Sequence, residues 1–301
     1  MKSPLHERPL ITEEHGIDPS RLLSESKPGR EDMLQLNAPH AVGDNTDGWS
    51  EVPNNFRTSG SPLPPPWEER FGPLRRGVVD DLVVVGQIGQ SIDGRIATVT
   101  GHSKYINGPA GLDHLHRLRA LVDAVLVGIG TAVADNPQLT VRRVAGPSPA
   151  RIVLDPRGRL SPDCRVLAGD GVRRLVVTAE GVRPRLAAGI ETVEIAAPGG
   201  EIAPAAILAA LAERGFRRIL IEGGAHTVSR FIAAGCLDRL HVMVAPTMLG
   251  SGQAGITLKP IQTADQALRA PMRAHLIGEE VLLDCDLSAQ RVAIGRAKKS
   301  T

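Results

Sequence analysis

The chain has 301 residues and a formal net charge of +2, with 35 basic against 33 acidic side chains. Hydrophobic residues make up 42% and charged residues 23%, which excludes a wholly disordered chain and predicts a globular protein of one or two domains. No basic run precedes the terminal Arg296–Lys299 segment, and aromatic residues are only 2%. Neither a grip on a phosphate backbone nor a base-stacking platform is therefore expected, and nucleic acid is excluded as an expected partner.

The cysteine pattern and the lack of long apolar segments bear on location. Cys164, Cys236 and Cys285 are widely spaced and odd in number, which provides neither a disulfide framework nor a CxxC site. No stretch approaches the roughly 18 uninterrupted apolar residues of a membrane-spanning helix. We expect a cytoplasmic protein without a membrane partner.

Residues 1–77 differ in composition from the rest of the chain. They hold 11 of the 23 prolines and show neither helical nor strand periodicity over any length. Residues 49–74 carry all four aromatic side chains of this extension, and exposed Trp and Phe rings are costly unless they pack against something. The sequence predicts a partly disordered extension with a docking arm, a main domain at 78–288 and a basic tail at 289–301. Disorder of the entire extension is the open alternative.

From Val78 onward, β-branched runs alternate with Ala/Leu-rich segments and Gly-rich turns, which is typical of α/β proteins. The predicted strands are 82–88, 124–127, 151–155, 174–178, 192–196, 218–222 and 239–245. The predicted helices are 110–122, 204–214 and 225–234. Segments 273–277 and 281–286 flank Gly278-Glu279-Glu280 and predict an antiparallel C-terminal hairpin that closes a mostly parallel sheet.

Two strand-to-helix junctions are candidate ligand sites. At Glu222-Gly223-Gly224, glycines allow close approach to the backbone, and the free N–H groups of the next helix can hold a phosphate. A tight turn without a ligand is the alternative interpretation, but Glu222 lies at the strand edge where open α/β sheets bind ligands. The junction at Gly128-Ile129-Gly130 resembles a dinucleotide fingerprint, yet Val133 stands where a small residue is required. A standard Rossmann domain is therefore the weaker interpretation.

Other polar segments are less informative taken singly. Asp93-Gly94 predicts only a turn. Ser103, Arg119 and the run at 139–142 can converge on a phosphorylated substrate, because guanidinium groups match phosphate bidentately. His114 and His116 are two residues apart on a predicted helix and face different ways, so no metal site is predicted.

A series of motifs, taken in order, resembles the reductase half of the riboflavin-pathway bifunctional deaminase/reductase. The resemblance covers about residues 80–286. The motifs are Ser91–Ala97, Gly101–Ile106, Leu118–Ala120 with Asp123–Ala124, Gly128–Pro137, Leu139–Arg142, Arg151–Asp155, Glu222–Gly224 and Ala245–Gly250.

The resemblance implies a dihydrofolate-reductase-like, three-layer α/β/α fold and a homodimer. It also implies NADPH-dependent reduction of 5-amino-6-(5-phosphoribosylamino)uracil, with hydride transfer to C1′ of the ribosyl group, through an opened imine form. The implied substrate-binding residues are Ser103, Arg119, Leu139, Arg142 and Glu222. The implied cofactor-binding residues are Gly89, Tyr105, Gly128, Gly130, Thr131, Asp135, Gly223, Gly224, Ala225, His226 and Thr227. Asp135 and Glu222 are the expected catalytic residues, with Asp135 orienting or protonating the reacting centre.

The sequence departs from the family pattern at three points. The His-x-Glu and Pro-Cys-x-x-Cys zinc pattern of the deaminase half is missing, so a separate deaminase is expected. Gln87 stands where many relatives carry lysine. Pro156 stands where serine is frequent, and Arg157 is a candidate for the NADPH 2′-phosphate.

These departures keep two alternatives open. One is a reductase of the same fold that acts on a pterin, a folate or a pyrimidine of a specialised pathway. The other is a non-catalytic nucleotide-binding protein.

Overall fold

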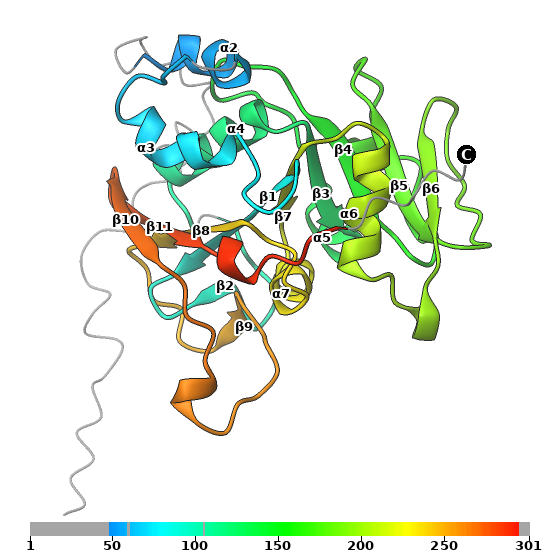
Figure 1. Cartoon of the computed structure of the whole chain (residues 1–301). Coiled ribbons are helices and arrows are strands. Elements are labelled where there is room, and N and C mark those ends of the chain that lie inside the picture. Colours follow the sequence, from blue (N-terminus) through cyan, green and yellow to red (C-terminus); the bar gives the residue numbers. More distant parts are fainter. Residues whose placement is uncertain (1–47, 59–60, 105, 295–301) are drawn as a thin grey trace, which may run out of the picture. The chain divides into compact units, whose positions relative to one another are not determined.

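The protein is built around one large β-sheet (Figure 1). The computed structural model describes residues 48–58, 61–104 and 106–294. The nine strands of the sheet lie in the order β10-β11-β8-β1-β7-β3-β4-β5-β6. Their bounds are β1 Val83–Ser91, β3 Ala124–Gly128, β4 Ala150–Leu154, β5 Arg174–Ala179, β6 Glu191–Ile195, β7 Arg218–Glu222, β8 Arg239–Ala245, β10 Met272–Ile277 and β11 Glu280–Asp286. A separate two-stranded ribbon pairs β2 (Arg95–Thr98) with β9 (Gly252–Ala254).

The strand pairings bring distant polar residues to one level of the sheet. From β8 to β6 all neighbouring strands are parallel, whereas β11 is antiparallel to both β8 and β10. In register, Gln87 of β1 lies beside Glu222 of β7 and His241 of β8, and His241 lies beside Asp284 of β11. A row of polar side chains thus crosses four strands at this level.

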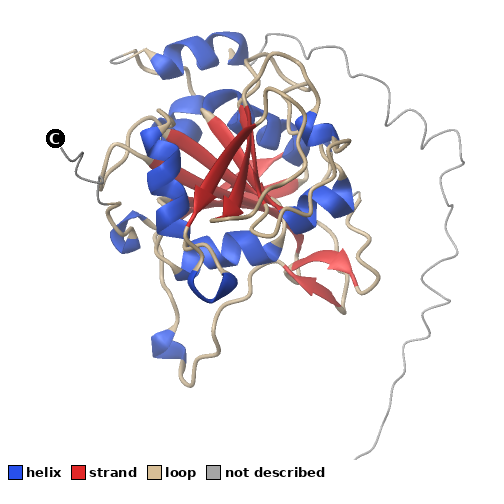
Figure 2. Cartoon of the chain, turned by 90° about the vertical axis from the view of Figure 1, so that its right-hand side faces the viewer, coloured by secondary structure: helices blue, strands red, loops and turns tan. Residues whose placement is uncertain are grey.

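Helices cover both faces of the sheet (Figure 2). On one face, α6 (Pro204–Glu213) and α7 (Ala225–Ala233) bury apolar side chains such as Leu208 and Phe231 against the strands. On the other face, α4 (Pro109–Leu121) buries Leu118 and Leu121. The two cores with the sheet between them confirm the predicted three-layer α/β/α fold with a mostly parallel sheet and an antiparallel C-terminal hairpin.

The predicted strands and helices are present with ends shifted by at most three residues, and the differences lie in short elements. The helix α5 (Ile129–Asp135) and both strands of the ribbon were not predicted. The helix is only seven residues long, and Gly130 in its first turn weakens its helical pattern. The ribbon strands have four and three residues, too few to show alternation, and they form only because they pair with each other.

The aromatic arm, residues 49–74, packs on the α4 side of the sheet. It contains α2 (Val52–Arg57) and α3 (Trp67–Phe71), and its Trp and Phe rings are buried in the same core as α4. The rings of Trp49 and Trp67 meet edge to face at 5.2 Å, and Phe71 stacks on His114 of α4 at 5.5 Å. The arm therefore packs against α4 and adds its rings to the core on this face of the sheet. Residues 1–47 of the extension that was predicted to be partly disordered lie outside the described residues.

Glu280 at the start of β11 holds the beginning of α4. Its buried carboxylate accepts hydrogen bonds from the N–H groups of Gly108 at 3.1 Å and Gly111 at 2.6 Å, and from the Asn107 amide at 2.8 Å. Helix N-termini leave backbone N–H groups without partners inside the helix, and a carboxylate there also interacts favourably with the helix dipole. Glu280 thus joins the C-terminal hairpin to α4.

We expect Glu280→Ala to lower the free energy of unfolding by about 2 kcal/mol, because buried N–H groups lose their acceptor. Glu279→Ala is the matched control, since the neighbouring Glu279 is exposed. Urea denaturation of both variants measures the difference. Equal stability of the two variants would contradict the proposed cap.

Candidate functional site

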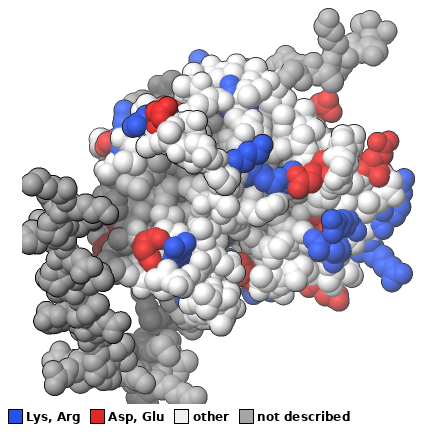
Figure 3. Space-filling view, turned by 90° about the horizontal axis from the view of Figure 1, so that it is seen from below, with Lys and Arg blue, Asp and Glu red and all other residues white. Residues whose placement is uncertain are grey.

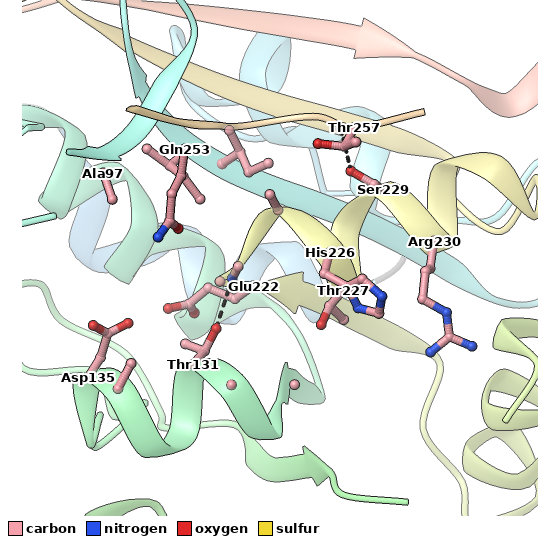
Figure 4. A pocket seen from close by; sticks show the side chains of 18 of the residues that line it. Ala97, Thr131, Asp135, Glu222, His226, Thr227, Ser229, Arg230, Gln253 and Thr257 are labelled. Carbon is pink, nitrogen blue, oxygen red and sulfur yellow. Dashed lines mark hydrogen bonds between the residues drawn. The ribbon is translucent and has the colours of Figure 1, made fainter. Parts of the chain in front are cut away.

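A cavity of about 1340 Å³ lies along the carboxyl ends of the parallel strands. Glu222 of β7, Gly128 of β3 and Leu154 of β4, each the last residue of its strand, line it. The start of α7 and the β2–β9 ribbon form other parts of its wall, and Figure 4 shows Asp135 and Gln253 pointing into it from opposite sides. Ligands of open α/β sheets bind at this edge.

Glu222 is buried at the cavity and forms an ion pair with Arg119 of α4. The guanidinium of Arg119 bonds both carboxylate oxygens of Glu222, with an Nε–Oε2 distance of 2.9 Å, and also donates to the carbonyl of Thr140 at 3.1 Å. This fork holds the Glu222 carboxylate in one orientation. Arg119 is itself buried and is not among the cavity-lining residues, so it acts on the cavity through Glu222.

The two glycine-containing junctions meet each other at the cavity. The hydroxyl of Thr131 accepts a hydrogen bond from the N–H of Gly224 at 2.9 Å. Gly223 has a φ of 89°, and a Cβ there would lie 2.8 Å from Thr131 Cγ2. A Cβ at Gly128 would lie 2.4 Å from Thr227 Oγ1. These glycines therefore allow the starts of α5 and α7 to approach each other, a packing role that sequence reasoning did not distinguish from ligand approach.

The start of α7 is open to a ligand. No side chain caps this nine-residue helix, and Gly224, Ala225, His226 and Thr227 line the cavity. Gly130 also lines it, and a Cβ at that position would meet nothing within 4 Å. Uncapped N–H groups at the positive end of a helix favour an anion such as a pyrophosphate.

Asp135, the last residue of α5, is the second carboxylate at the cavity. Partial burial raises the pKa of Asp135, and the nearby Lys104 ammonium opposes this rise. Ser103 also lines the cavity, in the loop that precedes α4. A carboxyl group with a raised pKa remains protonated to higher pH and can donate a proton or a hydrogen bond.

Two more predicted substrate residues, Leu139 and Arg142, lie outside the cavity lining, as Arg119 does. Leu139 is buried with a φ of 56°, and the Arg142 side chain is exposed. Partial burial and the neighbouring Arg119 guanidinium lower the pKa of Arg142. The N–H of Arg142 donates to His116 Nδ1 at 3.1 Å, while burial, aided by Arg119, lowers the pKa of His116 to about 3. His116 is thus a neutral acceptor that fixes the backbone of the run at 139–142.

The structure therefore brings most of the predicted residues to one cavity. Ser103 and Glu222 of the predicted substrate set line it. So do all the predicted cofactor residues that can be placed, Gly89, Gly128, Gly130, Thr131, Asp135, Gly223, Gly224, Ala225, His226 and Thr227. Tyr105 lies outside the described residues.

Sequence reasoning missed residues on elements it did not predict. The ribbon and the segment after it contribute Gln253, Thr257 and Lys259 to the cavity. Arg230 of the predicted helix α7, the end of the stretch from Gly224 that the resemblance assigns to the cofactor, also lines the cavity. Arg157 and Arg159, after β4, line the cavity as well. Of these two arginines, Arg157 carried a sequence signal, through its position after Asp155-Pro156.

The Ser91–Ala97 motif forms the predicted turn. The Asp93 carboxylate accepts hydrogen bonds from Ser91 Oγ at 2.6 Å, the N–H of Gly250 at 2.7 Å and the N–H of Leu249 at 3.1 Å. The Ser91 hydroxyl, followed by the two backbone N–H groups, lowers the pKa of Asp93 to about 2. Asp93 is therefore ionised and ties the turn after β1 to the segment before β9.

The donor set suits a nicotinamide dinucleotide better than a metal. Within residues 48–58, 61–104 and 106–294, no three His, Cys, Asp or Glu side chains form a metal-binding group. The cavity of about 1340 Å³ instead combines an open helix start with polar side chains, which suits a dinucleotide cofactor.

In the same described part of the chain, no helix has both the length and the apolarity to span a membrane. On the face in Figure 3, basic and acidic side chains are interspersed.

Comparison with known proteins identifies the family. The family model described as the RibD C-terminal domain matches residues 83–282. A curated relative from Methanothermobacter thermautotrophicus, named 2,5-diamino-6-ribosylamino-4(3H)-pyrimidinone 5′-phosphate reductase, is 32% identical over 209 residues, which cover 67% of this chain and 96% of the relative. The riboflavin biosynthesis protein RibD of Actinobacillus pleuropneumoniae is 30% identical over 67% of this chain, and the match spans 56% of that protein.

A solved structure supports the same family. The deaminase/5-amino-6-(5-phosphoribosylamino)uracil reductase of Thermotoga maritima has a TM-score of 0.60 and 27% identity, over 68% of this chain and 56% of the other. The match thus spans about half of the Actinobacillus and Thermotoga proteins and nearly all of the Methanothermobacter reductase. The resemblance seen in the sequence is confirmed, and the chain belongs to the family of RibD C-terminal reductase domains, an enzyme family whose chemistry implies a nicotinamide cofactor.

Proposed function

We propose that this chain is an NADPH-dependent reductase of riboflavin biosynthesis. Its substrate is 5-amino-6-(5-phosphoribosylamino)uracil, and hydride transfer to C1′ of the ribosyl group gives the ribitylamino product. The observation that carries the proposal is that the predicted cofactor residues and Glu222 share one cavity. The names of the relatives support the reductase activity and the pathway.

The cofactor half of the cavity is assigned to the side of α7. The uncapped start of this helix, at Gly224 and Ala225, suits the pyrophosphate of NADPH. The cavity wall also includes Arg157, Arg159 and Arg230, guanidinium groups that match a ribose 2′-phosphate. This basic wall supports NADPH rather than NADH.

The substrate half is assigned to the side of Glu222 and Asp135. Glu222, held by Arg119, accepts hydrogen bonds from polar groups of the substrate, and Ser103 contributes a hydroxyl. The exposed guanidinium of Arg142, in the loop that Arg119 contacts at Thr140, is assigned to the 5′-phosphate. Asp135 orients the reacting centre or supplies its proton.

Positioning is the main contribution that such a site makes. NADPH supplies the hydride when it is bound. The protein must hold the two reacting carbons about 3–3.5 Å apart and keep water from them. We assign this positioning to the bidentate Arg119–Glu222 pair, which orients the Glu222 carboxylate, and to the Thr131–Gly224 hydrogen bond, which holds the start of α7.

A homodimer is part of the proposal. The edge strand β10 exposes Met272 and Leu276, which alternate along one face and are 56% and 73% exposed. An apolar exposed edge strand promotes pairing with another chain. A monomer in light scattering at micromolar concentration would contradict the dimer.

We place the enzyme in the cytoplasm, where its three free cysteines remain reduced.

The test of the function is NADPH oxidation, followed by absorbance. The substrates are the phosphoribosylamino-uracil, its 2-amino counterpart, dihydrofolate and dihydropterin, each with purified full-length protein. Turnover of the uracil compound is expected. Turnover only of the 2-amino compound would correct the substrate, and turnover only of a pterin or folate would overturn the assignment. NADPH binding without oxidation of any substrate would indicate a non-catalytic protein.

We expect Glu222→Gln to lower kcat/KM by at least about tenfold, because the carboxylate that contacts substrate and anchors Arg119 is lost. The matched control is Glu191→Gln, since the exposed Glu191 also makes a two-point pair with an arginine, Arg173, away from the cavity. Steady-state kinetics, with the NADPH dissociation constant measured by calorimetry, separates substrate from cofactor effects. Equal kinetics of the two variants would remove Glu222 from the site.

The raised pKa of Asp135 predicts a pH effect on turnover. If the protonated carboxyl group acts in the reaction, kcat falls as the pH rises through this pKa, since the proton is then lost. Asp135→Asn should lower kcat by about 10²-fold or more and remove this pH dependence. A variant with unchanged kcat and an unchanged pH profile would exclude this role.

A further inference from the structure

The Ser91–Ala97 motif is not used by the proposed reaction, yet it forms a tight junction beside the cavity. Asp93 lies between β1 and β2, and it binds Leu249 and Gly250, which precede β9. The buried Ser91 hydroxyl donates to Asp93 and accepts from the N–H of Arg95 at 2.9 Å. One carboxylate therefore joins the two chain segments from which the ribbon strands extend.

Backbone contacts make this ribbon a compact unit. The N–H of Ile92 donates to the carbonyl of Thr247 at 2.8 Å, and the N–H of Gly255 donates to the carbonyl of Gly94 at 3.0 Å. A Cβ at Gly252 would lie 2.3 Å from the carbonyl oxygen of Ala97, so only glycine allows the two strands to pair this closely. A shift at the Asp93 end would therefore move β2 and β9 together.

The inner side of the ribbon is a wall of the cavity. Ala97 and Gln253 line it, and Figure 4 shows the Gln253 side chain directed toward the space beside Glu222 and Asp135. Beyond the ribbon, the N–H of Thr257 donates to Ser229 Oγ of α7 at 2.8 Å. The ribbon is thus fixed at both ends. Its one long polar side chain at the cavity, Gln253, offers both a donor and an acceptor.

We propose that Asp93 is a positioning residue, which holds the β2–β9 ribbon so that the Gln253 carboxamide contacts the substrate. This inference rests on the proposed function. Gln253 binds a polar group of the phosphoribosylamino-pyrimidine from the side opposite Asp135. Asp93 touches neither ligand and acts only through the ribbon.

Asp93→Asn is the sharpest change, because it keeps the size of the side chain. The carboxylate accepts the N–H of Leu249 on one oxygen and the N–H of Gly250 on the other. An asparagine amide has one oxygen, so in either orientation its NH₂ group faces a backbone N–H. One of the two attachments is therefore lost, and the ribbon loosens at that end.

The test is a double-mutant cycle with Asp93→Asn and Gln253→Ala, assayed by NADPH oxidation with the phosphoribosylamino-pyrimidine that the wild type reduces. Each single variant should lower kcat/KM by about tenfold, mainly through the KM of the pyrimidine. The double variant should lose little more than either single variant, because both changes remove the same contact. The NADPH dissociation constant should stay within about twofold of the wild-type value.

Asp265→Asn is the matched control. Asp265 is an exposed aspartate whose pKa is lowered by a hydrogen bond with Thr263, and it does not line the cavity. It should keep wild-type kinetics. Additive effects in the cycle, or wild-type kcat/KM in Gln253→Ala, would overturn the inference.

Amide hydrogen exchange provides a readout that does not depend on turnover. In Asp93→Asn, residues 95–98 and 252–254 should exchange at least about tenfold faster, while the central strands keep wild-type rates. Unchanged exchange in the ribbon would overturn the positioning role even if kinetics change. A wild-type enzyme that reduces neither pyrimidine would count against the proposed function, and hydrogen exchange would then decide the role of Asp93 alone.

Discussion

The buried ion pair between Arg119 and Glu222 is the constraint on which the site depends. A carboxylate at the end of β7 is costly to bury unless a cation satisfies it, and α4 supplies that cation. The position of α4 is in turn determined from two directions. Glu280 of the C-terminal hairpin binds its N-terminus, and the aromatic arm packs against it, with Phe71 stacked on His114. Segments from both ends of the described chain thus support one side chain at the cavity.

The same level of the sheet holds a second buried polar network, on the β8–β11 side. His114 of α4 and His241 of β8 share a hydrogen bond at 3.0 Å, and Asp284 of β11 lies 3.3 Å from His241. Although burial raises the pKa of Asp284, hydrogen bonds with His241 and Arg239 outweigh it and lower the value to about 2. This carboxylate is therefore ionised when buried. Together with the Arg119–Glu222 pair, the network ties α4 to β7, β8 and β11.

At the junctions that precede α5 and α7, glycines and threonine side chains meet without charged groups. Gly223 and Gly128 leave room for Thr131 and Thr227, which brings the starts of α5 and α7 together. This part of the cavity wall is thereby built from backbone groups, whose positions vary little, whereas the Arg119–Glu222 pair and the arginines at 157, 159 and 230 contribute charged side chains. Such a division suits a reaction in which hydride transfer demands positioning more than acid–base chemistry.

The sequence by itself determined the order of strands and helices, the hairpin and the two glycine junctions. These features depend on local patterns, namely apolar runs and glycine positions, and a carboxylate at a strand end was also visible in Glu222. The motif series indicated the family before any contact was known. The motifs also include Arg119 and Asp93, but the sequence did not show which residues these two side chains contact.

Only the tertiary structure decided what those residues contact. Arg119 pairs with Glu222 across 103 positions, and Asp93 binds Gly250 across 157. Neither contact leaves a periodic signal in the sequence, because both depend on which strands become neighbours. The sequence did not predict the ribbon that carries Gln253 either, because its short strands are stable only when they pair with each other. Local residue patterns thus determined the elements, and long-range pairing determined the site.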